Sequence, residues 1–258
     1  MKMKIQYVSD LHLEFPKNRQ FLEENSLKTE GDILILAGDI ILDKQMKKAE
    51  SFFNSWRLQY KQIIQIPGNH EFYDGEILYA YPDYYKELAS NHIKVNNKTI
   101  KIENIRFICS TLWTNIPFEF KNEFETKSND YKLIYYSKKH SEKRHISIED
   151  TNFFHSLSVD FIKKELTRPF SGKTILVTHQ LPSFDLINES DKNYLINHYC
   201  ASDLTSIYRN YDIDLWIFGH YHRTVDKKIN NTRFVSNPLG YMDEKQKEYF
   251  SRSAIIEV

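Results

Sequence analysis

The sequence has few cysteines, no excess of charge and no long apolar run, and each absence argues against a class of protein. Two cysteines in 258 residues cannot build a disulfide framework. Acidic and basic residues are balanced at 35 each, which disfavours a nucleic-acid partner without excluding it. No apolar run approaches the ~18–20 residues that span a bilayer, so no membrane partner is expected.

Other absences limit how the chain can be organised. No signal-peptide-like stretch and no Gly/Ser or Pro linker is visible, so we expect one cytoplasmic domain over residues 1–258, whose oligomeric state is open. Residues 114–148 are rich in Lys, Glu, Asn and aromatics and show weak periodicity. We interpret them as a partly helical insertion. It either lies over the active site or is a solvated surface excursion.

Short apolar runs alternate with helix-like stretches along the chain. The predicted strands are 5–8, 33–37, 62–66, 105–109, 174–178, 215–218, 224–229, 232–236 and 253–258. The predicted helices are 44–58, 82–89 and 153–166. This alternation predicts layered α/β packing, either one mixed sheet or two sheets packed face to face between helices.

Five short polar motifs follow predicted strands. They are Asp10-Leu11-His12, Gly38-Asp39, Gly68-Asn69-His70-Glu71, Thr178-His179 and Gly219-His220-Tyr221-His222. Ligands bind at the carboxyl ends of strands in α/β sheets, so these motifs are expected to converge on one sheet edge. Each motif alone is common and usually marks a turn or a structural histidine. Their shared placement favours a functional site.

The residue types favour a transition-metal site. Carboxylate, imidazole and amide oxygen together suit Mn, Fe, Zn or Ni, whereas calcium prefers oxygen ligands only. Asp10 and His12 are two residues apart and can hold one ion together, and His220 and His222 offer the same spacing. Glycines before Asp39, Asn69 and His220 permit sharp turns and close backbone approach beside a substrate.

The ordered set of motifs resembles the calcineurin-like metallophosphoesterase family, from Asp10 to Tyr241. Leu13-Glu14-Phe15 and the region around Trp113 resemble its bacterial-type single-domain branch. The resemblance implies an α/β fold, a four-layer α/β/β/α sandwich with mixed sheets. It also implies the metal ligands, namely Asp10, His12 and His222 for one ion, Asn69, His179 and His220 for the other, and Asp39 for both.

This resemblance implies a phosphoesterase with two divalent or mixed-valence ions, Mn, Fe or Zn. A hydroxide that bridges the ions would attack the phosphate of a small-molecule mono- or diester, with diesters slightly preferred. His70 would be the catalytic residue that serves the leaving group, oriented by Asp43 or Glu71. Many relatives have His-His where this chain has His179-Gln180, which leaves the role of Gln180 open.

Two other functions stay open. A DNA-processing nuclease would use the same metals, but the neutral charge counts against it. A non-catalytic scaffold of the same fold would lose metal ligands or the histidine at position 70, and this chain retains both. The remaining histidines, at positions 92, 140, 145, 155 and 198, match no metal motif and are interpreted as surface or structural residues.

Overall fold

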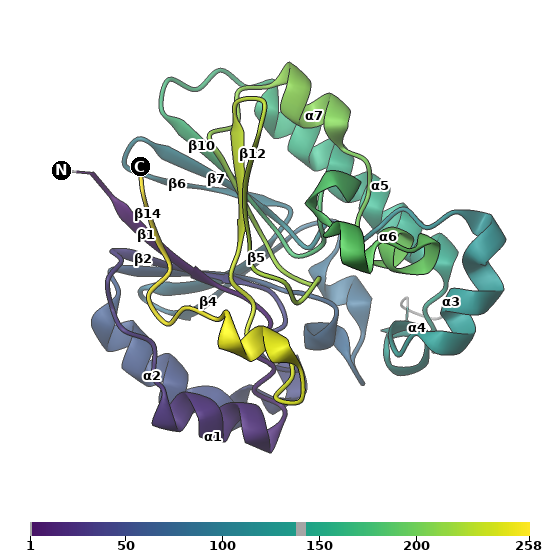
Figure 1. Ribbon diagram of the computed structural model, residues 1–258, viewed down its shortest axis with the longest axis horizontal. Coiled ribbons are helices and arrows are strands. Elements are labelled where there is room, and N and C mark those ends of the chain that lie inside the picture. Colours follow the sequence, from purple (N-terminus) through teal and green to yellow (C-terminus); the bar gives the residue numbers. More distant parts are fainter. Residues whose placement is uncertain (1, 138–142) are drawn as a thin grey trace.

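Two mixed six-stranded sheets form the centre of the protein (Figure 1). The computed structural model describes residues 2–137 and 143–258. The strand order is β14-β1-β2-β3-β5-β4 in the first sheet and β12-β13-β11-β10-β7-β6 in the second. In each sheet the four middle strands run parallel and an antiparallel strand closes each edge. The mixed sheets expected from the sequence are therefore confirmed.

The strands are short, as the apolar runs predict. The first sheet contains β1 (Lys4–Val8), β2 (Ile33–Ala37), β3 (Gln62–Ile66), β4 (Tyr84–Ala89), β5 (His92–Asn96) and β14 (Ile255–Glu257). The second contains β6 (Lys98–Ile102), β7 (Ile105–Ser110), β10 (Lys173–Thr178), β11 (Leu215–Phe218), β12 (Val225–Ile229) and β13 (Thr232–Ser236). A two-stranded ribbon pairs β8 (Tyr135–Tyr136) with β9 (Arg144–His145).

Side chains alternate between the two faces of each strand and so build separate cores. In β2, Ile33 and Ile35 join the core between the sheets, whereas Leu34 and Leu36 face the outer helices. In β10, Ile175 likewise faces the first sheet. Cys109 is a buried, unpaired hydrophobe in the same inner core, as predicted. Period-two alternation thus places apolar groups on both faces of both sheets.

Helices cover the outer faces and complete four layers. Figure 1 shows α1 and α2 against the first sheet and α5 and α7 against the second. The helices are α1 (Pro16–Glu24), α2 (Glu50–Gln59), α3 (Lys121–Lys127), α4 (Asp130–Leu133), α5 (Ile148–Leu166), α6 (Tyr194–Cys200) and α7 (Thr205–Asn210). None of the helices in the described residues has the length and apolar character needed to cross a bilayer.

Two of the predicted helices differ in the structure. The segment predicted as a helix over 82–89 is the edge strand β4, which pairs antiparallel with β5. Eight residues carry too little periodicity to separate the two states, and pairing with a neighbouring strand decides. The segment 44–58 divides at Ala49, where a 3₁₀ helix (Asp43–Ala49) ends and α2 begins. The strand β5 was not predicted at all.

The described residues of the segment at 114–148 pack beside the loop that follows β3. It contains α3, α4 and the two-stranded ribbon. Its apolar side chains, including Tyr131 and Ile134, share a core with Phe72 and Phe154. Packing against a shared core fixes α4 near the loop that follows β3, so this segment contributes directly to the region described next.

Candidate active site

The candidate ligands lie together at the carboxyl ends of five parallel strands. Asp10 and His12 follow β1, and Asp39 follows β2. Asn69 follows β3, His179 follows β10, and His220 and His222 follow β11. Strands from both sheets therefore meet at one edge, and six of these side chains, together with His70, form three overlapping clusters of donor atoms suited to a metal ion. The convergence expected from strand-end placement is what the structure shows.

Five of these seven residues have a left-handed backbone. The φ angles are 52° at Asp10, 47° at His12, 53° at Asp39, 67° at His220 and 50° at His222. Asp and His enter this region at a modest cost, whereas most side chains avoid it. The turn redirects each side chain sharply as its strand ends. A cluster of residues with strained backbone conformations at one edge of a fold is typical of a functional site.

Glycines in the motifs make room for the ligands themselves. A Cβ at Gly68 would lie 2.2 Å from Oδ1 of Asp39 and 2.6 Å from Nε2 of His179. A Cβ at Gly38, whose φ is +89°, would lie 2.3 Å from Nδ1 of His179. These glycines were expected to permit sharp turns and close approach to a substrate. The structure shows a left-handed turn at Gly38 and close approach to Asp39 and His179.

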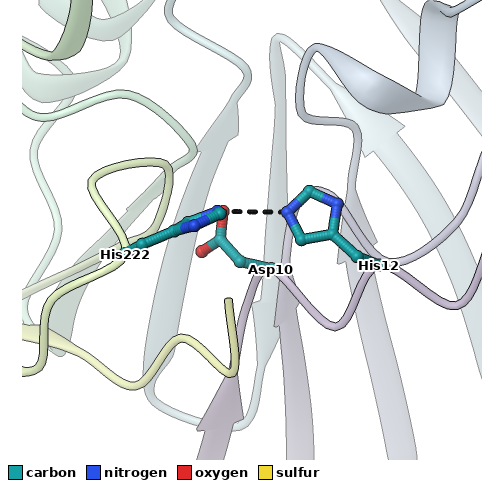
Figure 2. A group of neighbouring side chains, drawn as sticks. All are labelled: Asp10, His12 and His222. Carbon is teal, nitrogen blue, oxygen red and sulfur yellow. Dashed lines mark hydrogen bonds and ion pairs between the residues drawn. The ribbon is translucent and has the colours of Figure 1, made fainter. Parts of the chain in front are cut away.

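The first cluster joins Asp10, His12 and His222 (Figure 2). Nδ1 of His12 lies 3.0 Å from Oε1 of Glu14, and Nδ1 of His222 lies 2.8 Å from Oε2 of Glu244. Each carboxylate holds a proton on Nδ1 and so turns Nε2 inward as a lone pair. The two Nε2 atoms are 3.1 Å apart, and His222 Nε2 is 3.4 Å from Asp10 Oδ1. Once Nε2 of His222 has lost its proton, these converging acceptors suit a cation between them.

The second cluster repeats this arrangement with different supports. His179 donates Nδ1–H to the carbonyl of Ala37 at 2.9 Å, and its Nε2 faces Oδ1 of Asn69 at 3.2 Å. Nδ2 of Asn69 is already used as a donor to Asp130 at 2.8 Å, so Oδ1 must face inward. Nε2 of His220 is buried and has no hydrogen-bond partner among the described residues. These groups fit a metal ion.

Asp39 lies between the two clusters. Its Oδ2 is 3.3 Å from Nε2 of His179 and 3.9 Å from Nε2 of His12. Its Oδ1 accepts the backbone N–H of His70 at 2.8 Å. Burial raises the pKa of Asp39, but the neighbouring imidazoles, His179 foremost, outweigh it and hold the pKa well below the ordinary value. Asp39 is therefore an ionised carboxylate that both clusters share.

Two of the four ligand histidines, His179 and His222, are strongly basic when no metal competes for them, whereas burial is the main cause that lowers the pKa of His12 and lowers that of His220 to about 3. Burial lowers the pKa of His222, but hydrogen bonds to Asp10 and Glu244 prevail and raise it to about 10. Burial also lowers the pKa of His179, and the charge of Asp39 prevails and raises it to about 9. Both imidazoles lie in a concentration of negative charge, which is the electrostatic environment of a cation site.

His70 lies in a chain of polar groups that ends in the cavity. Its Nδ1 is 2.8 Å from Oε1 of Glu14, and its Nε2 is 3.2 Å from the hydroxyl of Tyr241. Tyr73 stacks on the ring at 4.2 Å between centroids. Burial lowers the pKa of His70, and Asp39 and Glu14 more than offset this and raise it above the ordinary value. The imidazole can therefore hold a proton beside the shared carboxylate.

The predicted orienting partners of His70 are both wrong. Asp43 forms an ion pair with the buried Lys94. Glu71 accepts the backbone N–H groups of Asp39 and Ile40 at 2.9 Å each, and of Gly68 at 2.7 Å, and so ties two strand-end loops together. Glu14 orients His70 instead. The carboxylate follows the first motif by two residues and belongs to the Leu13-Glu14-Phe15 segment noted in the sequence, but neither signal indicated contact with His70.

Asp130 is a site residue that the sequence analysis missed. The carboxylate is buried on α4 and accepts Nδ2 of Asn69 at 2.8 Å and the hydroxyl of Tyr73 at 2.7 Å. The hydroxyl of Tyr199 donates to its second oxygen at 3.1 Å. Burial raises the pKa of Asp130 although these donors oppose the rise. The segment at 114–148 therefore reaches the site and fixes the amide of Asn69.

Gln180 has a structural role in this arrangement. Its Oε1 accepts the backbone N–H of Trp113 at 3.0 Å, and its side chain is buried. Trp113 has a left-handed backbone with φ of 56°, so the amide stabilises a strained turn. Among the other histidines, His92 and His155 are buried and hydrogen-bonded to Gln65 and to the carbonyl of Trp113. The residue at 140 lies outside the described part of the chain.

A cavity of about 460 Å³ opens onto both clusters. Asp39, Asn69, His70, His220 and His222 line it, together with a polar wall that includes Tyr199, Arg223 and Tyr241. The guanidinium of Arg223 is partly exposed and bonds Asp191 at 3.0 Å. The donor atoms are therefore reachable from solvent, and a small anion has room beside them.

Comparison with known proteins agrees with this geometry. A family model described as "Calcineurin-like phosphoesterase" matches residues 3–224. The chain belongs to the calcineurin-like phosphoesterase family. An uncharacterised protein, L509, of Acanthamoeba polyphaga mimivirus is 34% identical in an alignment that covers 98% of this chain and 96% of that protein. The family supports a phosphoesterase hydrolase that acts on phosphate esters with divalent metals.

Solved structures were also compared with this chain, and one of them shares its fold. The phosphopantetheinyl hydrolase PptH of Mycobacterium tuberculosis aligns with a TM-score of 0.67 over 100% of this chain and 96% of its own, at 15% identity. A dimetal phosphatase from Danio rerio covers 95% of this chain and 90% of its own, with a TM-score of 0.43 at 11% identity. The PptH match confirms the expected four-layer fold of the family and leaves the substrate open.

Proposed function

We propose that this chain hydrolyses phosphate esters with two divalent or mixed-valence metal ions, Mn, Fe or Zn, and that it prefers diesters. The observation that carries the proposal is the pair of acceptor clusters that share Asp39. Asp10, His12 and His222 would hold one ion, and Asn69, His179 and His220 the other, with Asp39 bound to both. The buried, unpaired cysteines Cys109 and Cys200 fit a reducing cytoplasm, where we place the reaction.

The electrostatics of the site support an anionic substrate. Two divalent ions carry four positive charges, and Asp10 and Asp39 neutralise only two of them. When bound, such ions attract a phosphate group and bring the pKa of a water molecule toward neutrality. The chain supplies the rest through fixed groups. Arg223, paired with Asp191, lies at the cavity wall, and Glu14 and Glu244 hold the histidines in place.

His70 would serve the leaving group. Its Nε2 lies 4.0 Å from Oδ2 of Asp39, beside the place where a phosphate would lie. Glu14 keeps a proton on Nδ1 and favours the charged imidazole, so Nε2 can donate a proton to the departing oxygen. Tyr241, which bonds Nε2 at 3.2 Å, holds the ring in this orientation until a substrate enters.

A direct test uses purified protein with manganese, bis-p-nitrophenyl phosphate and p-nitrophenyl phosphate. We expect turnover of both and higher kcat/KM for the diester. His70→Ala should lower kcat while the metal content is unchanged, by less for these good leaving groups than for an ester of phenol, where the loss should approach the roughly 10²- to 10⁴-fold that general acid catalysis contributes. His145→Ala removes an exposed histidine and serves as the matched control. Wild-type protein that binds metal but cleaves neither ester would favour the scaffold alternative.

A further inference from the structure

Two cavities meet at His70 and Tyr241. The first is the cavity of about 460 Å³ that contains the candidate metal ligands. The second is a groove of about 1000 Å³ on the other side of the same two side chains. Its walls, as far as the described residues show, include none of the seven candidate ligands. A substrate bound over Asp39 therefore has space on both sides of the catalytic histidine.

The groove has an apolar interior and a polar rim. Its interior is formed by Phe15, Leu42, Tyr73, Leu133 and Met242. The ring of Phe15 is 42% exposed and meets Tyr241 edge-on at 5.6 Å between centroids. The rim carries charges of both signs, from Lys17, Asp74 and Asp243. An exposed aromatic ring beside a catalytic histidine is costly to keep in water and favours contact with an apolar ligand group.

We propose that this groove binds the leaving-group alcohol of a large organic phosphate ester through an aromatic or alkyl face. The inference rests on the proposed function. In an in-line displacement the incoming oxygen approaches from the metal side and the departing oxygen lies opposite it, toward His70. Because His70 lines both cavities, the group attached to the departing oxygen points into the groove. Arg223 and Tyr199 remain on the side of the retained group.

The volume of the groove sets the size of this alcohol. Ligand pockets commonly have volumes of roughly 300–1,000 Å³, so a groove at the upper end suits a group of nucleoside or extended-chain size. In the reaction, water forms the new bond to phosphorus and gives up one proton to solvent, from which His70 afterwards regains the proton that it donates. The ester bond breaks with its electron pair on the departing oxygen, and a proton from His70 converts that oxygen to the free alcohol.

Three phosphonate monoesters test this assignment, each with manganese-loaded protein. Phenyl methylphosphonate is the reference. 2-Naphthyl methylphosphonate enlarges the leaving group, and phenyl 2-naphthylphosphonate enlarges the retained group. With kcat/KM divided by the rate of alkaline hydrolysis of each ester, we expect at least about a tenfold gain from the larger leaving group. The larger retained group should raise this normalised kcat/KM by less.

Variants connect the gain to the groove. Phe15→Ala should narrow the naphthyl preference to roughly threefold or less, because the aromatic wall is removed. Phe153→Ala removes a comparably exposed ring on α5 and should keep the full preference. If Phe15→Ala unfolds, Phe15→Leu gives the same comparison with a smaller change. Equal rates for the phenyl and naphthyl leaving groups, or a larger gain from the retained group, overturn this inference alone. Inactivity on all three esters, from protein that turns over the p-nitrophenyl phosphates, also overturns this inference alone, whereas inactivity on those phosphates as well overturns the proposed function with it.

Discussion

Removing the carboxylate of Asp130 should weaken the binding of one of the two metal ions and leave the binding of the other unchanged. The buried carboxylate of Asp130 accepts a hydrogen bond from Nδ2 of Asn69 at 2.8 Å. This bond turns Oδ1 of Asn69 toward His179. In Asp130→Ala, Nδ2 of Asn69 retains only the longer contact with the hydroxyl of Tyr73, at 3.3 Å. An unsatisfied buried donor costs about 1–3 kcal/mol. Loss of an outer support of a metal ligand typically lowers affinity by roughly 10–100-fold.

Calorimetric titration with Mn²⁺ measures this effect. We expect two binding events in the wild type, and in Asp130→Ala a loss of about 10–100-fold in one of them only, since Asp10, His12 and His222 do not contact Asp130. Asp130→Asn keeps an acceptor for Asn69 and should recover most of the affinity. Tyr199→Phe removes another hydrogen bond to Asp130 without touching Asn69. Unchanged affinity at both sites in Asp130→Ala would refute this reasoning.

Two further predictions concern the ligands. The pKa values of His222, about 10, and His179, about 9, mean that both are protonated at pH 7 in the metal-free protein. Metal binding must therefore release protons, and apparent affinity for Mn²⁺ should rise with pH up to these values, which titrations in buffers of different ionisation enthalpy will show. Gly68→Ala should abolish metal binding because its Cβ would lie 2.2 Å from Asp39, whereas Gly75→Ala, with a nearest neighbour at 3.2 Å, should bind normally in the same titration.

Strands and strand-end motifs were the predictable part of this protein. Runs such as Ile33–Ala37 are apolar throughout because both faces of both sheets are covered. Edge elements were harder. β4 is exposed along its middle and carries a weak pattern, so its pairing with β5 could not be inferred from eight residues. The short polar helix α1 has only two buried side chains and gave no periodic signal.

The candidate ligands could be predicted because they occur in compact motifs, but their supports could not. Glu14, Glu244 and Asp130 act through contacts with residues that are distant in sequence or lie in another loop. A lone carboxylate in a polar segment has no pattern that separates it from a surface charge. Glu71 shows the opposite error, since its place in a motif suggested contact with His70, while the fold uses it to hold backbone amides.

The pairing of β1 with β14 has a practical consequence. Lys4, where β1 begins, lies opposite Glu257 of the antiparallel strand β14. The start of the first strand and the end of the last strand therefore lie together, at the end of the sheet away from the motifs (Figure 1). The five-residue strand β1 is roughly 16 Å long, which separates its first residue from the cavities. A reporter or an immobilising linker attached at either end should therefore leave both cavities open to solution, so captured protein can be assayed directly against large esters.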